Sequence, residues 1–340
     1  MKAALITGVT GQDGSYLAEF LLEKDYSVYG LARYCSERKH ERIEHLKSHP
    51  EFHLLEGDLT DTARVNSIIC TLGSTYDLVE VYNLGAQSHV KISFDQPEYT
   101  ANVDALGTLR ILEAIRQSNF TSKFKFYQAG TSEMFGKIQE PIQNENTPFY
   151  PRSPYGVSKL FGYWITKNYR ESYNIFACTG ILFNHESERR GEEFVTRKIT
   201  LGLAEWKKSG RAIELGNMDA KRDWGHAQDY VEAMWLMLQR NHPEDFVIAT
   251  GETHSIREFV EIACAEMGVT IRWTGNGVDE TCVDVATGHV IIKVNPEFYR
   301  PAEVDVLIGD ARKAQDLLGW RPKISFTDLV KRMTRHDLNS

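Results

Sequence analysis

Two side chains near the middle of the 340-residue chain could share acid–base chemistry. The stretch "SPYGVSKLF" places Tyr155 and Lys159 four residues apart, on one face of a helix expected over 154–172. Ser153 and Pro154 fit the N-cap and the first position of that helix. A lysine ammonium beside a tyrosine should lower the pKa of the phenol, so that the phenolate accepts a proton near neutral pH. The alternative interpretation is a half-buried aromatic residue beside a lysine that reaches solvent.

A second polar group follows an expected strand over 124–129, in "QAGTSEMFG". Thr131 or Ser132 could hydrogen-bond a substrate hydroxyl. Glu133 adds a carboxylate that hydride transfer alone does not require, which indicates a second proton transfer, as in an elimination. A solvated loop glutamate is the alternative interpretation.

Three glycines stand between the first apolar run and the first amphipathic segment, in "ALITGVTGQDGSYLAEF". Gly8 follows the run directly, and Gly11 and Gly14 come at steps of three. This context predicts a tight turn whose backbone approaches a pyrophosphate at a helix N-terminus. A glycine-rich turn with only a structural role is the alternative.

The end of the second expected strand indicates which dinucleotide would bind. An NAD site usually has Asp or Glu there to hold the ribose 2′-hydroxyl, but "GLARYCSERK" has Arg33. A guanidinium suits a 2′-phosphate, which predicts NADP, and a solvated arginine is the alternative. Asp58 ends the third strand, where an acid could meet the adenine. The small residues of "NLGAQSHV" would let the backbone approach the cofactor.

Apolar runs alternate with longer helical patterns through the first half of the chain. This alternation, with strands apolar on both faces, predicts an α/β fold: a Rossmann-like doubly wound parallel sheet. The expected strands span 3–7, 27–31, 52–55, 78–84, 124–129 and 176–182, and the helices span 14–24, 61–72, 98–117 and 154–172.

The pattern changes near residue 184. We expect an NADP-binding Rossmann domain over 1–183 and a smaller C-terminal α/β lobe for the substrate over 184–340, with a segment near 225–251 returning to the main sheet. Helices are expected in the lobe at 194–208, 226–239, 255–267 and 326–335.

Composition limits the partners and the location. A net charge of −8 argues against nucleic acid as the main partner. No apolar run approaches the ~20 residues of a membrane span. The first strand begins near residue 3, so no signal peptide is expected. The five cysteines lack C-x-x-C spacing, which indicates reduced thiols, no metal site and a cytoplasmic protein.

These motifs together resemble the extended short-chain dehydrogenase/reductase family. Within it, "NLGAQSHVKISFDQPEYTANVDALGTLR", "TPFYPRSPYGVSKL", "ILFNHESERRGEEFVTRKI", "LGNMDAKRDWGHAQDYVEAMW" and "RPAEVDVLIGD" are similar to dehydratases of GDP-sugars. The likeness runs from about residue 3 to 335.

The resemblance implies roles for individual residues. Thr131, Glu133 and Tyr155 would be catalytic, and Lys159 would tune Tyr155 and hold the nicotinamide ribose. The cofactor contacts implied are Gly8, Gly11, Gln12, Asp13, Gly14, Arg33, Asp58, Leu59, Leu84, Gly85, Ala86, Ser88, Tyr99, Tyr155, Lys159, His185 and Arg190. The substrate contacts implied are Ser88, Glu133, Asn184, Lys198, Arg222, Arg300 and Glu303.

The implied reaction is a 4,6-dehydration of GDP-mannose through tightly bound NADP, which is regenerated in each turnover. A related substrate such as GDP-manno-heptose is the nearest alternative. A reductase or epimerase of the same fold would generally lack Glu133, and a non-catalytic NADP-binding sensor would not need Tyr155, Lys159 and Glu133 together. The family also implies a homodimer or homotetramer, and Tyr34 and Cys35 depart from its pattern in a loop that pairs subunits.

Overall fold

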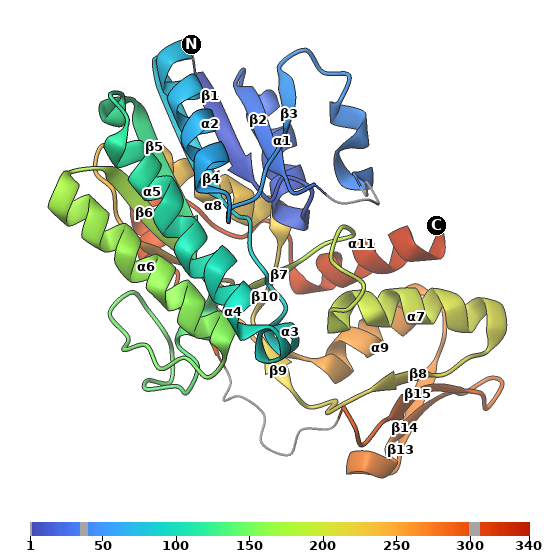
Figure 1. Cartoon of the computed structure of the whole chain (residues 1–340). Helices are drawn as coiled ribbons and strands as arrows, with labels where there is room; N and C mark the ends of the chain where they lie inside the picture. The colour runs from blue at the N-terminus through green and yellow to red at the C-terminus, as the bar shows by residue number, and fades with distance from the viewer. Residues whose placement is uncertain (1, 35–39, 299–306) are drawn as a thin grey trace.

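A seven-stranded parallel sheet forms the centre of the computed structural model, which describes residues 2–34, 40–298 and 307–340 (Figure 1). The strand order is β11-β6-β5-β4-β1-β2-β3. The strands are β1 (Lys2–Thr7), β2 (Ser27–Ala32), β3 (Phe52–Glu56), β4 (Leu78–Asn83), β5 (Phe124–Ala129), β6 (Phe176–Leu182) and β11 (Phe246–Ile248). The order reverses between β1 and β4, so the carboxyl ends of these strands flank the crevice where such sheets bind ligands. The predicted fold class is confirmed.

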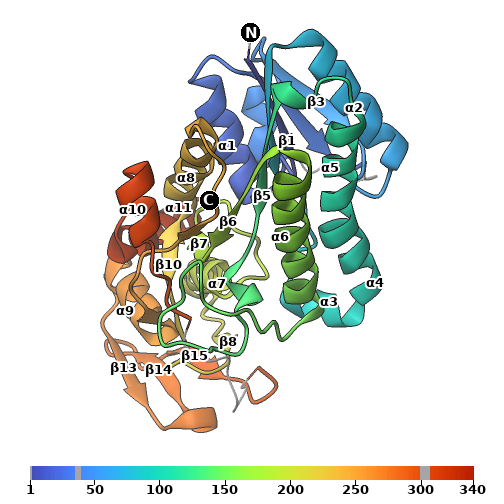
Figure 2. The same ribbon diagram turned by 90° about the vertical axis from the view of Figure 1, so that its left-hand side faces the viewer.

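Helices cover both faces of this sheet. Figure 2 shows α1 (Gln12–Leu22) and α8 (Ala227–Gln239) on one side and α2 (Thr62–Thr75), α5 (Gly107–Gln117) and α6 (Pro154–Tyr173) on the other. Successive strand residues point to opposite faces, so each strand feeds two apolar cores. In β1, Ala4 and Ile6 pack toward α1 and α8, whereas Ala3 and Leu5 pack toward α2 and α5.

The helix expected over 98–117 is not continuous. The chain forms α4 (Pro97–Thr100), then a π-helical turn, η2 (Ala101–Leu106), and only then α5. The apolar period continues through the π-helical turn, so periodicity alone did not reveal it. Other short helices were also missed, the longer of them being η1 (Glu41–Leu46), α3 (Val90–Asp95) and α10 (Arg312–Leu318).

A second lobe lies beyond the carboxyl edge of the main sheet and has its own core (Figure 1). Its helices are α7 (Val195–Ser209), α9 (Ile256–Glu266) and α11 (Phe326–Leu338), close to three of the expected ranges. They pack with a four-stranded sheet in the order β13-β14-β15-β8, formed by Ile271–Thr274, Thr281–Asp284, Val290–Val294 and Ile213–Leu215.

Short ladders and late segments join the lobe to the main sheet. β7 (Asn184–Glu186) pairs with β10 (Trp224–His226), and β9 (Lys221–Arg222) pairs with β12 (His254–Ser255). β11 pairs with β6, and Trp320 packs in the core beneath α1 and α8. The chain therefore returns to the main domain twice after residue 184. The predicted domain boundary at 183/184 stays a prediction. In the ranges described, no helix is long and apolar enough to cross a bilayer.

Candidate active site

The turn between β1 and α1 leaves no room for side chains. Gly8 has a φ of +70°, and a Cβ there would lie 2.9 Å from the Gly85 Cα. A Cβ on Gly14 would lie 2.3 Å from the Gly8 carbonyl oxygen. Only glycine fits both positions, because the backbone must turn left-handed at Gly8 and the first turn of α1 must touch it. The sequence correctly predicted a tight glycine turn before α1, and its binding of a dinucleotide pyrophosphate stays a prediction.

A cavity of about 550 Å³ opens in front of this turn, between the main sheet and the second lobe. It collects most of the predicted site residues from segments far apart in the sequence. Those lining it are Gly8, Gly11, Gln12, Asp13, Gly14, Leu84, Gly85, Ala86, Ser88, Thr131, Glu133, Tyr155, Lys159, Asn184, His185, Arg190 and Arg222.

Tyr155 and Lys159 lie on the first two turns of α6, as predicted. Ser153 accepts a hydrogen bond from the Gly156 N–H at 3.0 Å, and Pro154 takes the first helical position. Both functional side chains are buried. The Lys159 Nζ donates to the Ala129 carbonyl oxygen at 3.1 Å and lies 5.9 Å from the centre of the Tyr155 ring.

In the chain by itself the net shift of the Tyr155 pKa is upward, opposite to the direction expected from the neighbouring lysine. Burial raises the pKa of Tyr155, and the carboxylates of Asp104 and Glu133 raise it further, whereas the hydrogen bond with Thr131 and the charge of Arg190 lower it. The spacing along the helix indicated only Lys159 as an influence on the pKa of Tyr155. Burial and carboxylates from other segments have the larger effect on the pKa of Tyr155.

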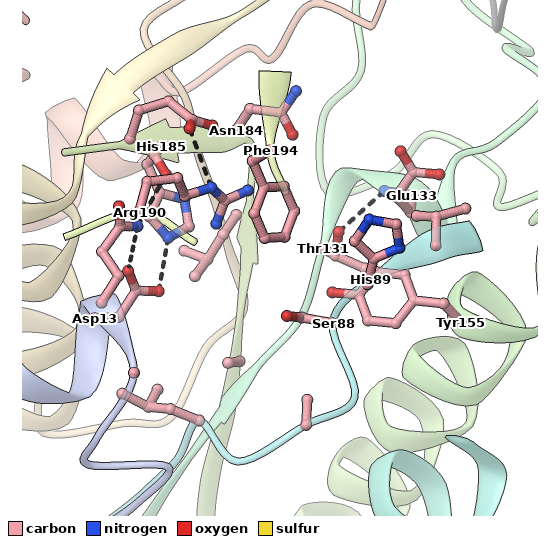
Figure 3. A pocket seen from close by; sticks show the side chains of 18 of the residues that line it. Asp13, Ser88, His89, Thr131, Glu133, Tyr155, Asn184, His185, Arg190 and Phe194 are labelled. Carbon is pink, nitrogen blue, oxygen red and sulfur yellow. Dashed lines mark hydrogen bonds and ion pairs between the residues drawn. The ribbon is translucent and has the colours of Figure 1, made fainter. Parts of the chain in front are cut away.

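Thr131 and Glu133 follow β5 and face the tyrosine. The Thr131 Oγ1 accepts a hydrogen bond from the Glu133 N–H at 3.3 Å, which begins the short helix η4 (Ser132–Met134). Figure 3 shows Thr131, Glu133 and Tyr155 on one side of the cavity. A hydroxyl, a phenol and a carboxylate therefore meet at the carboxyl edge of the sheet.

The opposite side of the cavity carries two basic side chains, each paired with a carboxylate. His185 Nδ1 lies 2.7 Å from the Phe183 carbonyl oxygen, and Nε2 lies 2.7 Å from the Asp13 carboxylate. Arg190 lies beside them, with its Nε 3.0 Å from the Glu186 carboxylate (Figure 3). A dinucleotide phosphate placed before the Gly8 turn would meet these cations.

A second hollow of about 380 Å³ adjoins the first at the ends of β2, β3 and β4. Arg33, Asp58, Leu59 and Tyr99 line it. The Arg33 guanidinium donates to the Tyr99 hydroxyl, and the Asp58 carboxylate accepts from the Thr60 N–H at 2.8 Å. Arg33 and Asp58, predicted to meet the 2′-phosphate and the adenine, thus share one hollow with Leu59 and Tyr99, two further predicted cofactor contacts.

One predicted substrate residue, Lys198, lines neither cavity, and two others lie outside the described residues. Lys198 lies on α7, with its ammonium 4.3 Å from the centre of the Phe298 ring. Arg300 and Glu303 lie outside the described residues, as does Cys35.

Several residues that line the cavity were not predicted from the sequence, among them His89, Lys91 and Phe194. His89 caps α3 through a hydrogen bond from the Ile92 N–H to Nδ1 at 3.4 Å, and its ring lies 5.6 Å from that of Phe194. The available signal was the place of His89 directly after Ser88 in "NLGAQSHV". Across the described residues, no group of three or more His, Cys, Asp or Glu side chains could hold a metal ion.

Comparison with known proteins gives a consistent result. A family model described as GDP-mannose 4,6 dehydratase matches residues 5–333. A GDP-mannose 4,6 dehydratase of Drosophila melanogaster is 58% identical over 99% of this chain and 86% of its own length.

Two solved structures share the fold at lower identity. DesIV, a dTDP-glucose 4,6-dehydratase from Streptomyces venezuelae solved with NAD, has a TM-score of 0.81 and 20% identity over 99% of this chain and 96% of its own. RMD from Pseudomonas aeruginosa, complexed with NADPH, has a TM-score of 0.76 and 21% identity over 99% of each chain. The family model and the Drosophila relative show that the chain belongs to the GDP-mannose 4,6-dehydratase family.

Proposed function

We propose that the chain converts GDP-mannose to GDP-4-keto-6-deoxymannose, moving hydride from C4 to C6 of one sugar and releasing water. The observation that carries this proposal is the carboxylate of Glu133 in the same cavity as Thr131, Tyr155 and Lys159. Oxidation of an alcohol needs a base for the hydroxyl proton, whereas dehydration also needs a group that removes a carbon-bound proton. The family model and the Drosophila relative carry the same activity in their names.

The nicotinamide cofactor is proposed to be NADP. When bound, it would accept the hydride from C4 and return it to C6. The backbone of Gly8, Gly11 and Gly14 would approach the pyrophosphate, and Lys159 would hold the nicotinamide ribose. RMD carries NADPH and DesIV carries NAD, so the preference rests on Arg33, whose guanidinium suits a 2′-phosphate.

Tyr155 would act as the base in the oxidation. Its phenolate takes the proton of the 4-hydroxyl while hydride leaves C4. Burial and nearby carboxylates raise the pKa of Tyr155, so the phenolate depends on the hydrogen bond with Thr131 and the charge of Arg190, with the Lys159 ammonium close to the ring. Thr131 would also orient the sugar hydroxyl.

Glu133 would perform the elimination. The 4-keto group acidifies the C5 proton, the Glu133 carboxylate takes it, and the C6 hydroxyl leaves as water with a proton from Glu133 or Tyr155. A proton then returns to C5 as hydride enters C6. The sugar gives up two protons, from the 4-hydroxyl and from C5; one leaves in the water and the other returns to C5.

The substrate residues are proposed from the resemblance. Arg222 lines the cavity, and its charge suits a diphosphate in an acidic protein. Asn184 and Ser88 line the same cavity, with Ser88 between the two charged sides in Figure 3. Arg300 would contribute to the diphosphate site and Glu303 to the ribose hydroxyls.

The test is incubation of GDP-mannose with the protein and NADP+, followed by mass spectrometry and NMR. We expect loss of one water, a 4-keto hydrate signal and no net NADPH. Glu133→Gln should lose dehydration while retaining some C4 oxidation, and Tyr155→Phe should lose both steps, because oxidation comes first. Normal turnover by either variant would refute the assigned roles.

Two controls complete the experiment. Glu23→Gln removes an exposed carboxylate at the C-terminus of α1 and should leave turnover unchanged. GDP-manno-heptose is run in parallel: dehydration of the heptose alone would keep the mechanism and change the substrate. Cofactor binding without conversion of either sugar would favour the alternative function, a non-catalytic NADP-binding sensor.

Self-association is proposed from an apolar face of α6. Val157, Phe161 and Trp164 recur at helical spacing and are 55%, 40% and 51% exposed, so they form one uncovered stripe. A second copy of this chain is the proposed partner. Trp164→Lys should lower the mass measured by analytical ultracentrifugation, whereas Val285→Lys, at an equally exposed position in the second lobe, should not. An unchanged mass for Trp164→Lys would exclude this face.

A cytoplasmic location is likewise proposed. Cys70, Cys178, Cys264 and Cys282 are free thiols, as expected in a reducing compartment. Cell fractionation of the tagged full-length chain would test it, and recovery in a membrane or secreted fraction would contradict it.

A further inference from the structure

Asp104 is a buried carboxylate close to the catalytic pair, and neither the motifs nor the reaction scheme uses it. It lies on η2, the π-helical turn that packs against α6, and it is 2% exposed. Its Oδ1 accepts a hydrogen bond from the Gln87 N–H at 2.8 Å, whereas Oδ2 is buried and has no hydrogen-bond partner among the residues that the structure describes. A carboxylate oxygen left in this condition is costly unless a nearby charge offsets it.

The backbone fixes Asp104 beside the turn of α6 that carries Lys159. Its carbonyl oxygen accepts from the Thr108 hydroxyl at 2.9 Å. A Cβ on Gly162, three residues after Lys159, would lie 3.7 Å from the same carbonyl. This is an ordinary van der Waals distance, so η2 lies directly against this face of α6. Single π-helical turns within α-helices often occur at functional sites.

Lys159 is a buried positive charge that faces the buried negative charge of Asp104. It is 4% exposed, and its ammonium donates one hydrogen bond, to Ala129. Burial lowers the pKa of Lys159, and Asp104, followed by Asp13, raises it. In return, burial raises the pKa of Asp104 to about 6, and Lys159 is the charge that lowers it.

We propose that Asp104 is a positioning residue of the catalytic site, whose buried charge keeps Lys159 an ammonium beside Tyr155. The inference rests on the proposed function, because it assigns Asp104 to the Tyr155–Lys159 pair of that reaction. Asp104 does not line either cavity, and its charge acts on Lys159 and on Tyr155. The other charges facing the pair are Asp13, Glu133 and Arg190.

Asp104→Asn tests the proposal, because the asparagine is isosteric and its Oδ1 can still accept from Gln87. Removing the charge should move both limbs of the kcat/KM profile to lower pH. The acid limb should move because Asp104 raises the pKa of Tyr155. The alkaline limb should move because Asp104 also raises the pKa of Lys159. The alkaline limb should shift to lower pH by about 1–2 units. The ratio of variant to wild-type activity should be about one below pH 6, where wild-type Asp104 is protonated, should exceed one along the acid limb, and should fall to about a tenth along the alkaline limb. A ratio that is the same at every pH, or a shift to higher pH, would overturn the proposal.

Controls separate charge from structure. Asp229→Asn removes another buried carboxylate, which accepts from the Lys323 and Ile324 N–H groups at 2.9 and 3.0 Å. It should lower the melting temperature without moving the pH profile. Asp104→Glu should restore the alkaline limb and Asp104→Gln should not, and this pair repeats the comparison if Asp104→Asn fails to fold.

A second readout separates this inference from the proposed activity. NADP+ affinity is measured by calorimetry from pH 5.5 to 9, where Asp104→Asn should weaken binding only at the alkaline end. That result without conversion of GDP-mannose would keep the role of Asp104 and refute the substrate. Equal affinities for Asp104→Asn and wild type at every pH would overturn the inference about Lys159.

Discussion

His185 and Asp13 form a partly buried ion pair, with 2.7 Å between Nε2 and Oδ2, that joins β7 to the first turn of α1. The other ring nitrogen faces the Phe183 carbonyl oxygen at 2.7 Å. Both neighbours can only accept hydrogen bonds, so the imidazole is held with a proton on each nitrogen. The pair therefore fixes the loop after β6 against the glycine turn and places a cation beside the cradle.

This pair predicts a pH-dependent stability. Burial alone would lower the pKa of His185, but Asp13 outweighs it, and the net pKa is raised from its ordinary 6.5. Burial would raise the pKa of Asp13, but His185 outweighs it, and the net pKa is lowered from 3.8. The histidine contribution is complete below pH 6.5 and is lost as pH rises through the raised value; the aspartate contribution is complete above pH 3.8 and is lost as pH falls through the lowered value.

His185→Gln tests this dependence by melting temperature between pH 5 and 9. The variant should lie furthest below wild type at pH 5–6, and the gap should narrow toward pH 9. His45→Gln removes an exposed histidine that also faces a carboxylate, Glu19, and should change little. A gap that does not vary with pH would show that His185 acts by packing alone.

Gly14→Ala should damage the cofactor site. The added Cβ would lie 2.3 Å from the Gly8 carbonyl oxygen, so the turn and α1 must separate. We expect a cost of about 1–3 kcal/mol in stability and at least a tenfold loss of NADP+ affinity. Gly268→Ala, with a φ of +73° and open space around its Cβ, should cost about 1–2 kcal/mol and leave affinity unchanged. Equal NADP+ affinity in the two variants would refute the cradle.

Arg33→Ala should discriminate between the two dinucleotides. Loss of a charge-assisted contact to the 2′-phosphate is worth about 1.5–3 kcal/mol, so NADP+ affinity should fall about 10- to 100-fold while NAD+ affinity changes little. Arg64→Ala removes an arginine that donates to the Glu56 carbonyl oxygen at 2.8 Å, near the same end of β3, and serves as control. If NAD+ and NADP+ weaken equally, Arg33 is not the 2′-phosphate ligand.

Asp223→Asn should affect the substrate more than the cofactor. This buried carboxylate follows Arg222 and accepts from the N–H groups of Thr250, Gly251 and Gly309 at 2.9, 3.0 and 3.4 Å. It thereby joins three chain segments behind the arginine of the cavity. We expect KM for GDP-mannose to rise about tenfold, at a cost of about 1.5–3 kcal/mol in stability, with NADP+ affinity unchanged.

Steady-state kinetics and a cofactor titration measure these effects together. Asp219→Asn, an exposed carboxylate of the same lobe that accepts from Arg257 at 3.0 Å, is the control. A fall in kcat at constant KM would contradict a positioning role for Asp223.

Local patterns were enough to predict several features of this protein. The period of apolar residues predicted the strands of the main sheet, and Ser153 and Pro154 predicted where α6 begins. The spacing of the glycines predicted the turn at Gly8. These features depend on interactions between residues a few positions apart, which a sequence displays directly.

The charges around the site were decided by the tertiary structure. The 172 residues between Asp13 and His185 give no indication that the two side chains meet. The direction of the Tyr155 pKa shift depends on burial and on Asp104, which the irregular turn η2 brings against α6. Desolvation and Coulomb interactions depend on distances in space, and the packing of η2 and β7 against α6 and α1 sets those distances after the local elements have formed.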